Sequence, residues 1–198
     1  MKSHIALWRL WLMAGVLLIV TGAQAGELVA SFKEDFQDET PKKGWQYQWN
    51  ADTVDDTATY ANLSYQSEKH AYVTDPYAGG EGAPAGPYIK RDFAHPGAES
   101  SSGGKNCIYT YTLQAGQGGK ISITDSTIIR VDQANPGDIE VRIRVNDTVG
   151  DPVSIETKGS FDRELGTLKD GDVISVLVGP GASANFDMYR VDFSLIKE

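Results

Sequence analysis

Short segments in which polar and apolar residues alternate run through the chain after residue 25, and they limit its possible folds more than any other feature. Residues 140–146 (EVRIRVN) are the clearest example, because three apolar side chains alternate with charged ones there. Successive side chains of a β-strand point to opposite faces of the sheet, so the apolar set faces a core while Arg142 and Arg144 face solvent. Glycine, proline, asparagine and aspartate separate these segments, and helical spacing is hard to find. The pattern predicts an all-β sandwich or barrel.

Eight segments show this pattern or a short apolar run, and each predicts a strand. They are residues 28–36, 44–50, 106–113, 120–129, 140–146, 153–156, 173–178 and 186–196. Asp170 and Gly171 stand between two of them and can adopt the positive φ of a tight hairpin turn. Residues 51–104 are less regular and contain five tyrosines. A long irregular segment in a compact domain usually provides functional loops.

The N-terminus has the features of a secretory signal peptide over residues 1–25. Lys2 and Arg9 precede an apolar run over residues 10–20, and Ala23-Gln24-Ala25 forms a cleavage site of small residues. The alternative is a membrane anchor, but the run is shorter than the roughly 20 residues of a comfortable span. We therefore expect a protein of the periplasm or the extracellular space, with no membrane span after cleavage.

Cleavage would leave residues 26–198, which is the size of one β-sandwich domain with its own core. The removed segment contains two basic residues and no acid, so the formal net charge changes from −9 to −11. A chain this acidic is a poor partner for nucleic acid or for an anionic membrane surface, whereas it suits cation binding. Its only cysteine, Cys107, excludes an intramolecular disulfide and is expected to be a small buried side chain rather than a nucleophile.

The order of several segments resembles a known class of secreted modules. The segments are FKEDF (32–36), GWQYQWN (44–50), HPG (95–97), YTL (111–113), KISI (120–123), VRIRVND (141–147), LKDGDVISVLVGP (168–180) and DMYRVDFSL (187–195). This order is similar to the galactose-binding-like jelly rolls, notably the carbohydrate-binding modules of bacterial polysaccharide-degrading enzymes. The resemblance covers nearly all of the chain after residue 25 as a pattern of strands and turns. It implies a two-sheet antiparallel β-sandwich and a polysaccharide or other glycan as partner.

Two groups of aromatic residues are candidates for carbohydrate binding. Trp45, Tyr47 and Trp49 share one face of the predicted strand 44–50, where they either form a platform for a sugar ring or fill the sandwich core. Composition favours the core, because large aromatic side chains dominate such interiors. In the resembling modules, ligands often meet loops at one edge of the sandwich. The loop tyrosines are therefore equally good candidates, namely Tyr60, Tyr72, Tyr77 and Tyr88.

The resemblance also implies a structural calcium ion that ties the first strand to the last. Calcium prefers several hard oxygen ligands, such as carboxylates and backbone carbonyls. By position, Glu34 and Asp192 are the best candidate ligands, and Asp187 is a weaker one. The alternative is that all three are ordinary solvated acids of an acidic protein.

Catalytic signatures are sparse. The histidines after residue 25, His70 and His95, have no metal-ligand spacing such as H-x-x-x-H, and there is no G-x-S-x-G motif. Tyr88, Lys90, Arg91 and His95 supply the residue types that jelly-roll polysaccharide lyases use. The strongly negative net charge would repel a polyanionic substrate unless it is reversed locally.

We therefore expect a secreted, non-catalytic carbohydrate-binding protein. A small polysaccharide lyase or other glycan-active enzyme is one alternative, since catalytic partners meet only in three dimensions. A structural or adhesive β-sandwich of the cell surface is another. An exposed aromatic patch beside polar groups would favour sugar binding, whereas a broad apolar patch would favour a protein partner.

Overall fold

The computed structural model describes residues 26–74, 86–97, 104–131, 133, 137–181 and 187–198. The predicted signal peptide and Tyr77 lie outside these residues. Within them, no helix is long and apolar enough to cross a membrane.

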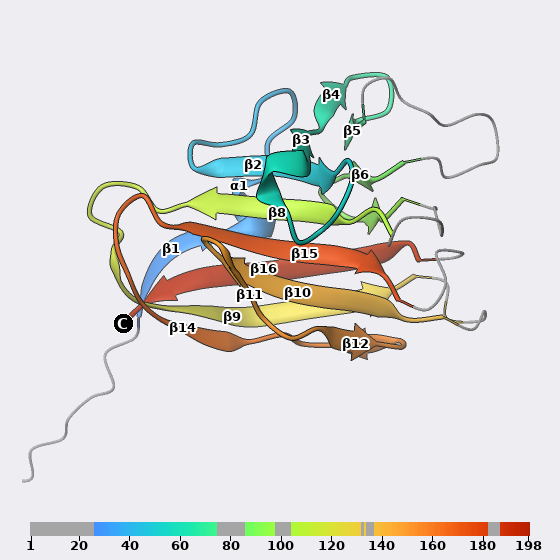
Figure 1. The fold of residues 1–198 in the computed structure, drawn as a ribbon. Coiled ribbons are helices and arrows are strands. Elements are labelled where there is room, and N and C mark those ends of the chain that lie inside the picture. Colours follow the sequence, from blue (N-terminus) through green and yellow to red (C-terminus); the bar gives the residue numbers. More distant parts are fainter. Residues whose placement is uncertain (1–25, 75–85, 98–103, 132, 134–136, 182–186) are drawn as a thin grey trace, which may run out of the picture.

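Two antiparallel sheets face each other and form a sandwich (Figure 1). The first has nine strands: β1 (Glu27–Ser31), β4 (Ser64–Gln66), β5 (Ala71–Val73), β6 (Tyr88–Ile89), β7 (Ala94–His95), β9 (Gly119–Arg130), β13 (Lys158–Gly159), β14 (Arg163–Leu168) and β16 (Tyr189–Lys197). The second has seven: β2 (Trp45–Asn50), β3 (Tyr60–Asn62), β8 (Cys107–Thr112), β10 (Ile139–Val145), β11 (Thr148–Val149), β12 (Val153–Ile155) and β15 (Val173–Pro180). The predicted all-β, two-sheet antiparallel sandwich is confirmed.

The order of strands within each sheet differs from their order in the chain. The nine-stranded sheet runs β13-β9-β16-β7-β6-β5-β4, with β1 also beside β16 and β14 beside β9. The seven-stranded sheet runs β11-β10-β15-β8-β2-β3, with β12 beside β10. The last strand, β16, thus lies in the interior of its sheet, where it pairs with β9 along its whole length.

The first predicted strand is shorter than expected. It ends at Ser31, and the helix α1 (Phe32–Asp35) follows it. Phe32 and Phe36 lie four positions apart, and both enter the core, each 1% exposed. Phe32 packs at 4.8 Å from Tyr109 and at 5.9 Å from Phe193, measured between ring centroids. The helix therefore fixes the N-terminal segment by inserting two aromatic rings between the sheets.

The burial of the aromatic side chains of β2 decides whether they form a sugar platform or fill the sandwich core. Trp45 is 4% exposed and Tyr47 is 2% exposed, so both belong to the core. Trp49, at the end of the strand, is partly exposed and packs against the core edge. The core interpretation is therefore correct for the first two residues.

One predicted orientation is wrong. Arg144 does not face solvent as the alternation predicted, since it is only 5% exposed. Its guanidinium donates hydrogen bonds to the hydroxyl of Tyr60 at 2.8 Å, to the carbonyl oxygen of Asp55 at 2.9 Å and to that of Asn146 at 3.0 Å. The loop that follows β2 covers this face of β10, and alternation along a single strand cannot reveal that cover.

Candidate functional site

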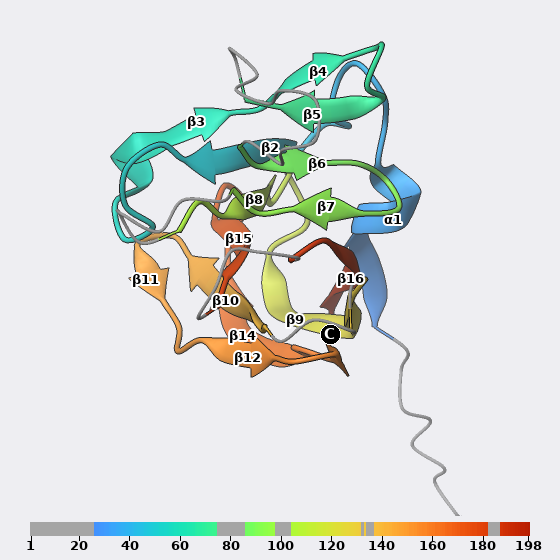
Figure 2. The same cartoon turned by 90° about the vertical axis from the view of Figure 1, so that its right-hand side faces the viewer.

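A gap in the nine-stranded sheet creates the site. On one edge of β16, the pairing with β1 ends at Ser194, and the pairing with β7 begins only at Tyr189. No strand of the described chain pairs with residues 190–193 on that edge; α1 contacts β16, and its Phe32 ring lies 5.9 Å from the ring of Phe193. Figure 2 shows α1 next to the turn between β6 and β7. The gap is therefore bordered by a helix on one side and a turn on the other.

This gap opens onto a groove of about 650 Å³ on the outer face of the sheet, which we call the sheet-face groove. Its lining residues come from α1 (Lys33), from the β6–β7 turn (Arg91, Asp92 and Phe93), from β9 (Thr127 and Ile129) and from β16 (Arg190, Val191 and Asp192). The floor follows from strand register, because Arg190 pairs with Ile129 and Asp192 pairs with Thr127. Paired residues share a face, so these four side chains lie together.

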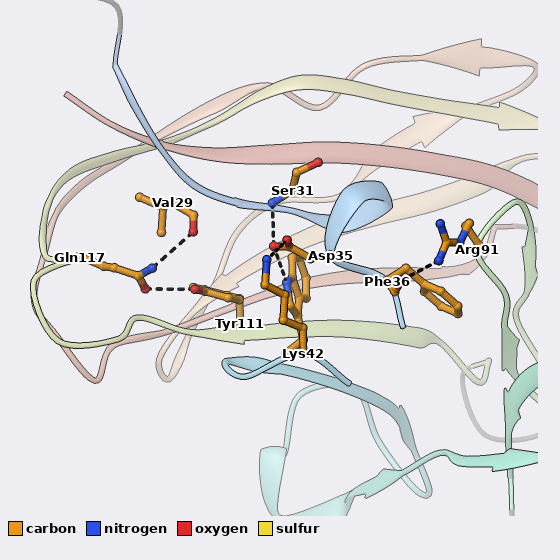
Figure 3. A network of polar contacts seen from close by, with 9 residues as sticks. Val29, Ser31, Asp35, Phe36, Lys42, Arg91, Tyr111 and Gln117 are labelled. Carbon is orange, nitrogen blue, oxygen red and sulfur yellow. Dashed lines mark hydrogen bonds and ion pairs between the residues drawn. The ribbon is translucent and has the colours of Figure 1, made fainter. Parts of the chain in front are cut away.

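The helix wall of the groove is held by Asp35 (Figure 3). Its carboxylate accepts hydrogen bonds from the backbone amide of Ser31 and from the indole nitrogen of Trp45, both at 3.1 Å, and it forms an ion pair with Lys42. Burial alone would raise the pKa of Asp35, but the hydrogen bonds from Lys42, Trp45 and Ser31 outweigh burial and hold this pKa below its usual value. These contacts fix α1, and with it the backbone of Lys33.

The opposite wall is the turn between β6 and β7. Arg91 donates a hydrogen bond of 2.9 Å to the carbonyl oxygen of Phe36, just after α1 (Figure 3). The backbone amide of Lys90 donates to the carbonyl oxygen of Phe93 at 2.9 Å and closes the turn. The ammonium of Lys90 lies 5.1 Å from the centre of the Phe93 ring, and Tyr88 packs edge-on against that ring at 6.1 Å. The turn is thus fastened to the helix, and its aromatic ring is supported from behind.

Two charged side chains of the groove bond to the protein backbone, since Arg91 donates to Phe36 and the carboxylate of Asp192 accepts from the amide of Phe193 at 3.0 Å. Within the described residues, none of the three cations Lys33, Arg91 and Arg190 forms an ion pair, and neither do Asp92 and Asp192. Hydrogen-bond donors and acceptors therefore face the open space of the groove beside the Phe93 ring.

A second hollow of about 490 Å³ lies next to the groove on the same face. It is lined by Glu68, Lys69, His70, Ala71, Val73, Tyr88 and Lys90. Because Tyr88 and Lys90 contact Phe93, these two side chains separate the hollow from the groove.

The predicted carbohydrate-binding aromatics that the structure describes, all except Tyr77, are spread over the molecule rather than gathered at one place. Trp45 and Tyr72 are buried, 4% and 1% exposed, and present no face to a ligand. Tyr60 is half-buried, and its hydroxyl donates a 2.6 Å hydrogen bond to the carbonyl oxygen of Val54. It also accepts from the buried arginine of β10, which gives it a structural role.

Trp49 and Tyr88 are the two predicted aromatics that keep a clear link to the surface. Trp49 is partly exposed, and Lys105 places its ammonium 5.6 Å from the centre of a Trp49 ring. Tyr88 lines the second hollow, at the border of the sheet-face groove. Of the sequence-predicted aromatic residues that the structure describes, Tyr88 is therefore the one that lies at the border of the site.

The three predicted calcium ligands do not come together. Glu34 is exposed on α1, Asp192 lines the groove on the outer face, and Asp187 is completely buried. In the described part of the chain, no group of three or more acidic, histidine or cysteine side chains could hold a metal ion. These residues do not fit a single calcium site as a set, and calcium binding stays a prediction.

Asp187 is nevertheless unusual. Neither of its buried carboxylate oxygens has a hydrogen-bond partner within the described residues. Burial raises the pKa of Asp187 to about 7, although the guanidinium of Arg130 lowers it and Asp138 raises it further.

A polysaccharide lyase built from the predicted residues would need Tyr88, His95 and a basic residue to converge in one groove. His95 is 5% exposed, and its ring stacks against Tyr88 at 5.9 Å. Burial lowers the pKa of His95, and its Nδ1 atom contacts the carbonyl oxygen of Pro96. The imidazole is therefore covered and does not line either hollow, whereas His70 lines the second one.

Sequence reasoning missed Phe93 and Arg190 as site residues. A signal for Arg190 was present, because Arg190 and Asp192 are the polar members of the alternating last strand. Phe93 had no comparable signal, since it stands in a short turn inside the irregular segment.

Comparisons with known proteins leave the family open. No family model matches the sequence, and no curated protein matches it. Solved structures similar to this chain include TmCBM61 in complex with β-1,4-galactotriose, at 12% identity and a TM-score of 0.39, over 87% of this chain and 99% of that one. The β-glucosidase from Kluyveromyces marxianus is similar at 13% identity and a TM-score of 0.36, over 89% of this chain and 19% of that one. TM-scores this low carry no argument about the site or its ligand.

Proposed function

We propose that this protein binds carbohydrate without catalysis and that the sheet-face groove is the binding site. The observation that carries the proposal is the position of Phe93, an aromatic ring at the wall of an open groove, among five charged side chains that form no ion pair within the described residues. Secretion to the periplasm or the extracellular space belongs to the proposal because of the predicted signal peptide. A structural calcium ion is a separate expectation, and the groove does not depend on it.

The chemistry of the groove suits a sugar ring. A pyranose has an apolar C–H face, which packs on an aromatic ring, and hydroxyl groups around its edge. Asp92 and Asp192 can accept hydrogen bonds from hydroxyl groups, while Arg91 and Arg190 can donate to them. The volume of about 650 Å³ lies within the range of roughly 300–1,000 Å³ found for small-molecule sites.

Rigid walls favour binding in this place. The groove floor consists of paired strands, and Asp35 and Arg91 fasten the two walls to each other through α1 and Phe36. A site held in its binding conformation loses little conformational entropy when the ligand enters. The exposed apolar surface of the described residues is small, with Leu28 and Val131 as its large exposed members, which argues against a broad protein-docking face.

The test is affinity electrophoresis of the protein through gels that contain one polysaccharide each. We expect retardation by at least one polysaccharide, and we expect Phe93→Ala to remove most of it, because the ring supplies the apolar contact. Leu28→Ala is the matched control, since it removes an exposed apolar side chain (53% exposed) on β1. Unretarded migration of the wild type in every gel, or equal retardation of the Phe93→Ala variant, would refute the proposal.

A glycan-active enzyme is the second candidate, and one observation favours it. Asp92 and Asp192 line the same groove, and glycosidases use two carboxylates that flank the scissile bond. Release of reducing ends from a bound polysaccharide, lost in Asp192→Asn with binding retained, would replace the non-catalytic proposal with this one. Binding without release supports the non-catalytic proposal.

A further inference from the structure

We propose that the sheet-face groove selects acidic saccharides, in which the sugar ring carries a carboxylate, over neutral ones. This inference rests on the proposed function of the same groove. It concerns the class of ligand, which neither the fold nor the chain's overall composition indicates.

The first argument is the local charge of this face. The groove and the adjacent hollow contain five cations, Lys33, Lys69, Lys90, Arg91 and Arg190, and three carboxylates, Glu68, Asp92 and Asp192. The face therefore carries a formal excess of two positive charges on a chain whose formal net charge is −9. An acidic protein repels anions in general, so a cationic face concentrates anionic ligands at that one place.

The second argument is that the groove cations are available to a ligand. Arg91 uses Nη2 for its bond to the carbonyl oxygen of Phe36, and its guanidinium lies 5.8 Å from the centre of the Phe36 ring; the side chain is nevertheless exposed and lines the groove. Arg190 is exposed on β16, and Lys33 is exposed on α1. Among the described residues, no carboxylate lies within 4.0 Å of the charged nitrogens of these three side chains. A ligand carboxylate would thus gain new ion pairs without breaking existing ones.

The third argument concerns the geometry of the charges. Lys33 comes from the helix wall, Arg91 from the turn wall and Arg190 from the floor, so cations surround the groove from three sides. A guanidinium offers parallel N–H donors that match the two oxygens of a carboxylate. A neutral sugar has no group that satisfies these donors equally well.

The two aspartates set an upper limit on the negative charge of the ligand. Asp92 and Asp192 reduce the formal charge of the groove itself to plus one. This matches one carboxylate per bound sugar ring, with the aspartates accepting bonds from its hydroxyl groups. A densely sulfated or phosphorylated chain would place further negative charge against these aspartates, which is unfavourable.

The experiment compares acidic polysaccharides with their own neutral forms. Polygalacturonate, alginate and hyaluronan are each tested beside the carboxyl-reduced polymer, in which every carboxylate has become a primary alcohol. Binding to the full chain is measured by affinity electrophoresis and by calorimetric titration, at low salt and at 0.5 M NaCl.

We expect at least one acidic polymer to bind about tenfold or more tightly than its reduced form, the size expected for a charged hydrogen bond. Salt should weaken the acidic binding and leave the neutral binding nearly unchanged. Arg190→Gln should lower the affinity for the acidic polymer to the level of the reduced one. Arg163→Gln, on β14 beside a different hollow, is the matched control and should bind as the wild type does.

The possible failures are distinct. Equal binding of an acidic polymer and its reduced form, or unchanged acidic binding by Arg190→Gln, overturns the choice of acidic ligand and leaves carbohydrate binding in place. Tight binding of neutral polymers alone likewise overturns the choice of an acidic ligand and leaves carbohydrate binding in place. Failure of the wild type to bind any polysaccharide, acidic or neutral, overturns the proposed function together with this inference.

Discussion

Replacing Asp35 with alanine should destabilise the fold because this carboxylate connects β1, α1 and β2. The variant loses the acceptor of the Trp45 indole nitrogen, the acceptor of the Ser31 amide and the partner of Lys42. Trp45 is 4% exposed and Ser31 is 8% exposed, so both donors stay buried without an acceptor.

The magnitude follows from these three contacts. An unsatisfied buried donor costs about 1–3 kcal/mol, a typical hydrogen bond contributes about 1 kcal/mol, and a pair with an exposed lysine contributes about 0.2–1 kcal/mol. Both lost hydrogen bonds are only partly buried, so the lower half of the range applies to each donor, and we expect the free energy of unfolding to fall by about 2–4 kcal/mol. For a protein of this size, that loss lowers the melting temperature by roughly 5–15 °C.

Asp35→Asn separates the contributions, because an amide oxygen can still accept both hydrogen bonds while the charge is lost. We expect this variant to lose about 1 kcal/mol or less at neutral pH. The pKa of folded Asp35 lies below the value of 3.8 for the free side chain, so its ionised form stabilises the fold above that pH. This contribution is lost as pH falls through the folded pKa of Asp35. The difference in free energy of unfolding between the wild type and Asp35→Asn should therefore vanish below that pH.

Urea unfolding followed by tryptophan fluorescence measures these differences, with Asp151→Ala as the control. Asp151 is exposed and makes no hydrogen bond or ion pair within the described residues. A midpoint for Asp35→Ala equal to that of Asp151→Ala would refute the assigned role of this carboxylate. A free energy of unfolding that stays higher in the wild type than in Asp35→Asn below the folded pKa of Asp35 would refute it as well.

Two further predictions concern Arg144 and calcium. Arg144→Met should lower the free energy of unfolding by about 2–4 kcal/mol in urea, because it leaves buried acceptors around the loop after β2 unsatisfied, and it should leave glycan binding unchanged. A loss below about 0.5 kcal/mol would contradict the structural role given to this arginine. A melting curve in EDTA and then in excess calcium tests the predicted ion, because a ligand of the folded state must raise the midpoint. A shift that Asp187→Asn abolishes would assign Asp187 as a ligand, and equal midpoints would contradict calcium binding.

Alternation along the chain was sufficient to predict an all-β sandwich or barrel, and the resemblance to secreted jelly-roll modules favoured the two-sheet sandwich. A strand with one buried face repeats its apolar residues at every second position, and residues 140–146 and 186–196 do so clearly. The turn at Gly171 was predictable for a similar local reason, and its φ of 88° is in the left-handed region that glycine readily adopts.

Local patterns failed where a distant segment decides the environment of a residue. Arg144 occupies an outward position of its strand, yet the loop after β2 covers it. Tyr72 stands in an irregular, polar segment, yet its ring lies in the core and its hydroxyl donates to Gln37 at 2.7 Å. Burial depends on what packs above a face, and a single strand does not carry that information.

Strand alternation, turn residues such as Gly171 and the excess of negative charge are local properties that can be recognised in the sequence alone. The position of the binding groove depends on how distant strands pair. The groove exists because β1 and β7 pair with different parts of the same edge of β16 and leave residues 190–193 between them. Lys33, Phe93 and Arg190 meet there although they lie far apart in the chain. Long-range strand pairing creates that proximity, and pairing partners are a property of the whole fold rather than of any segment.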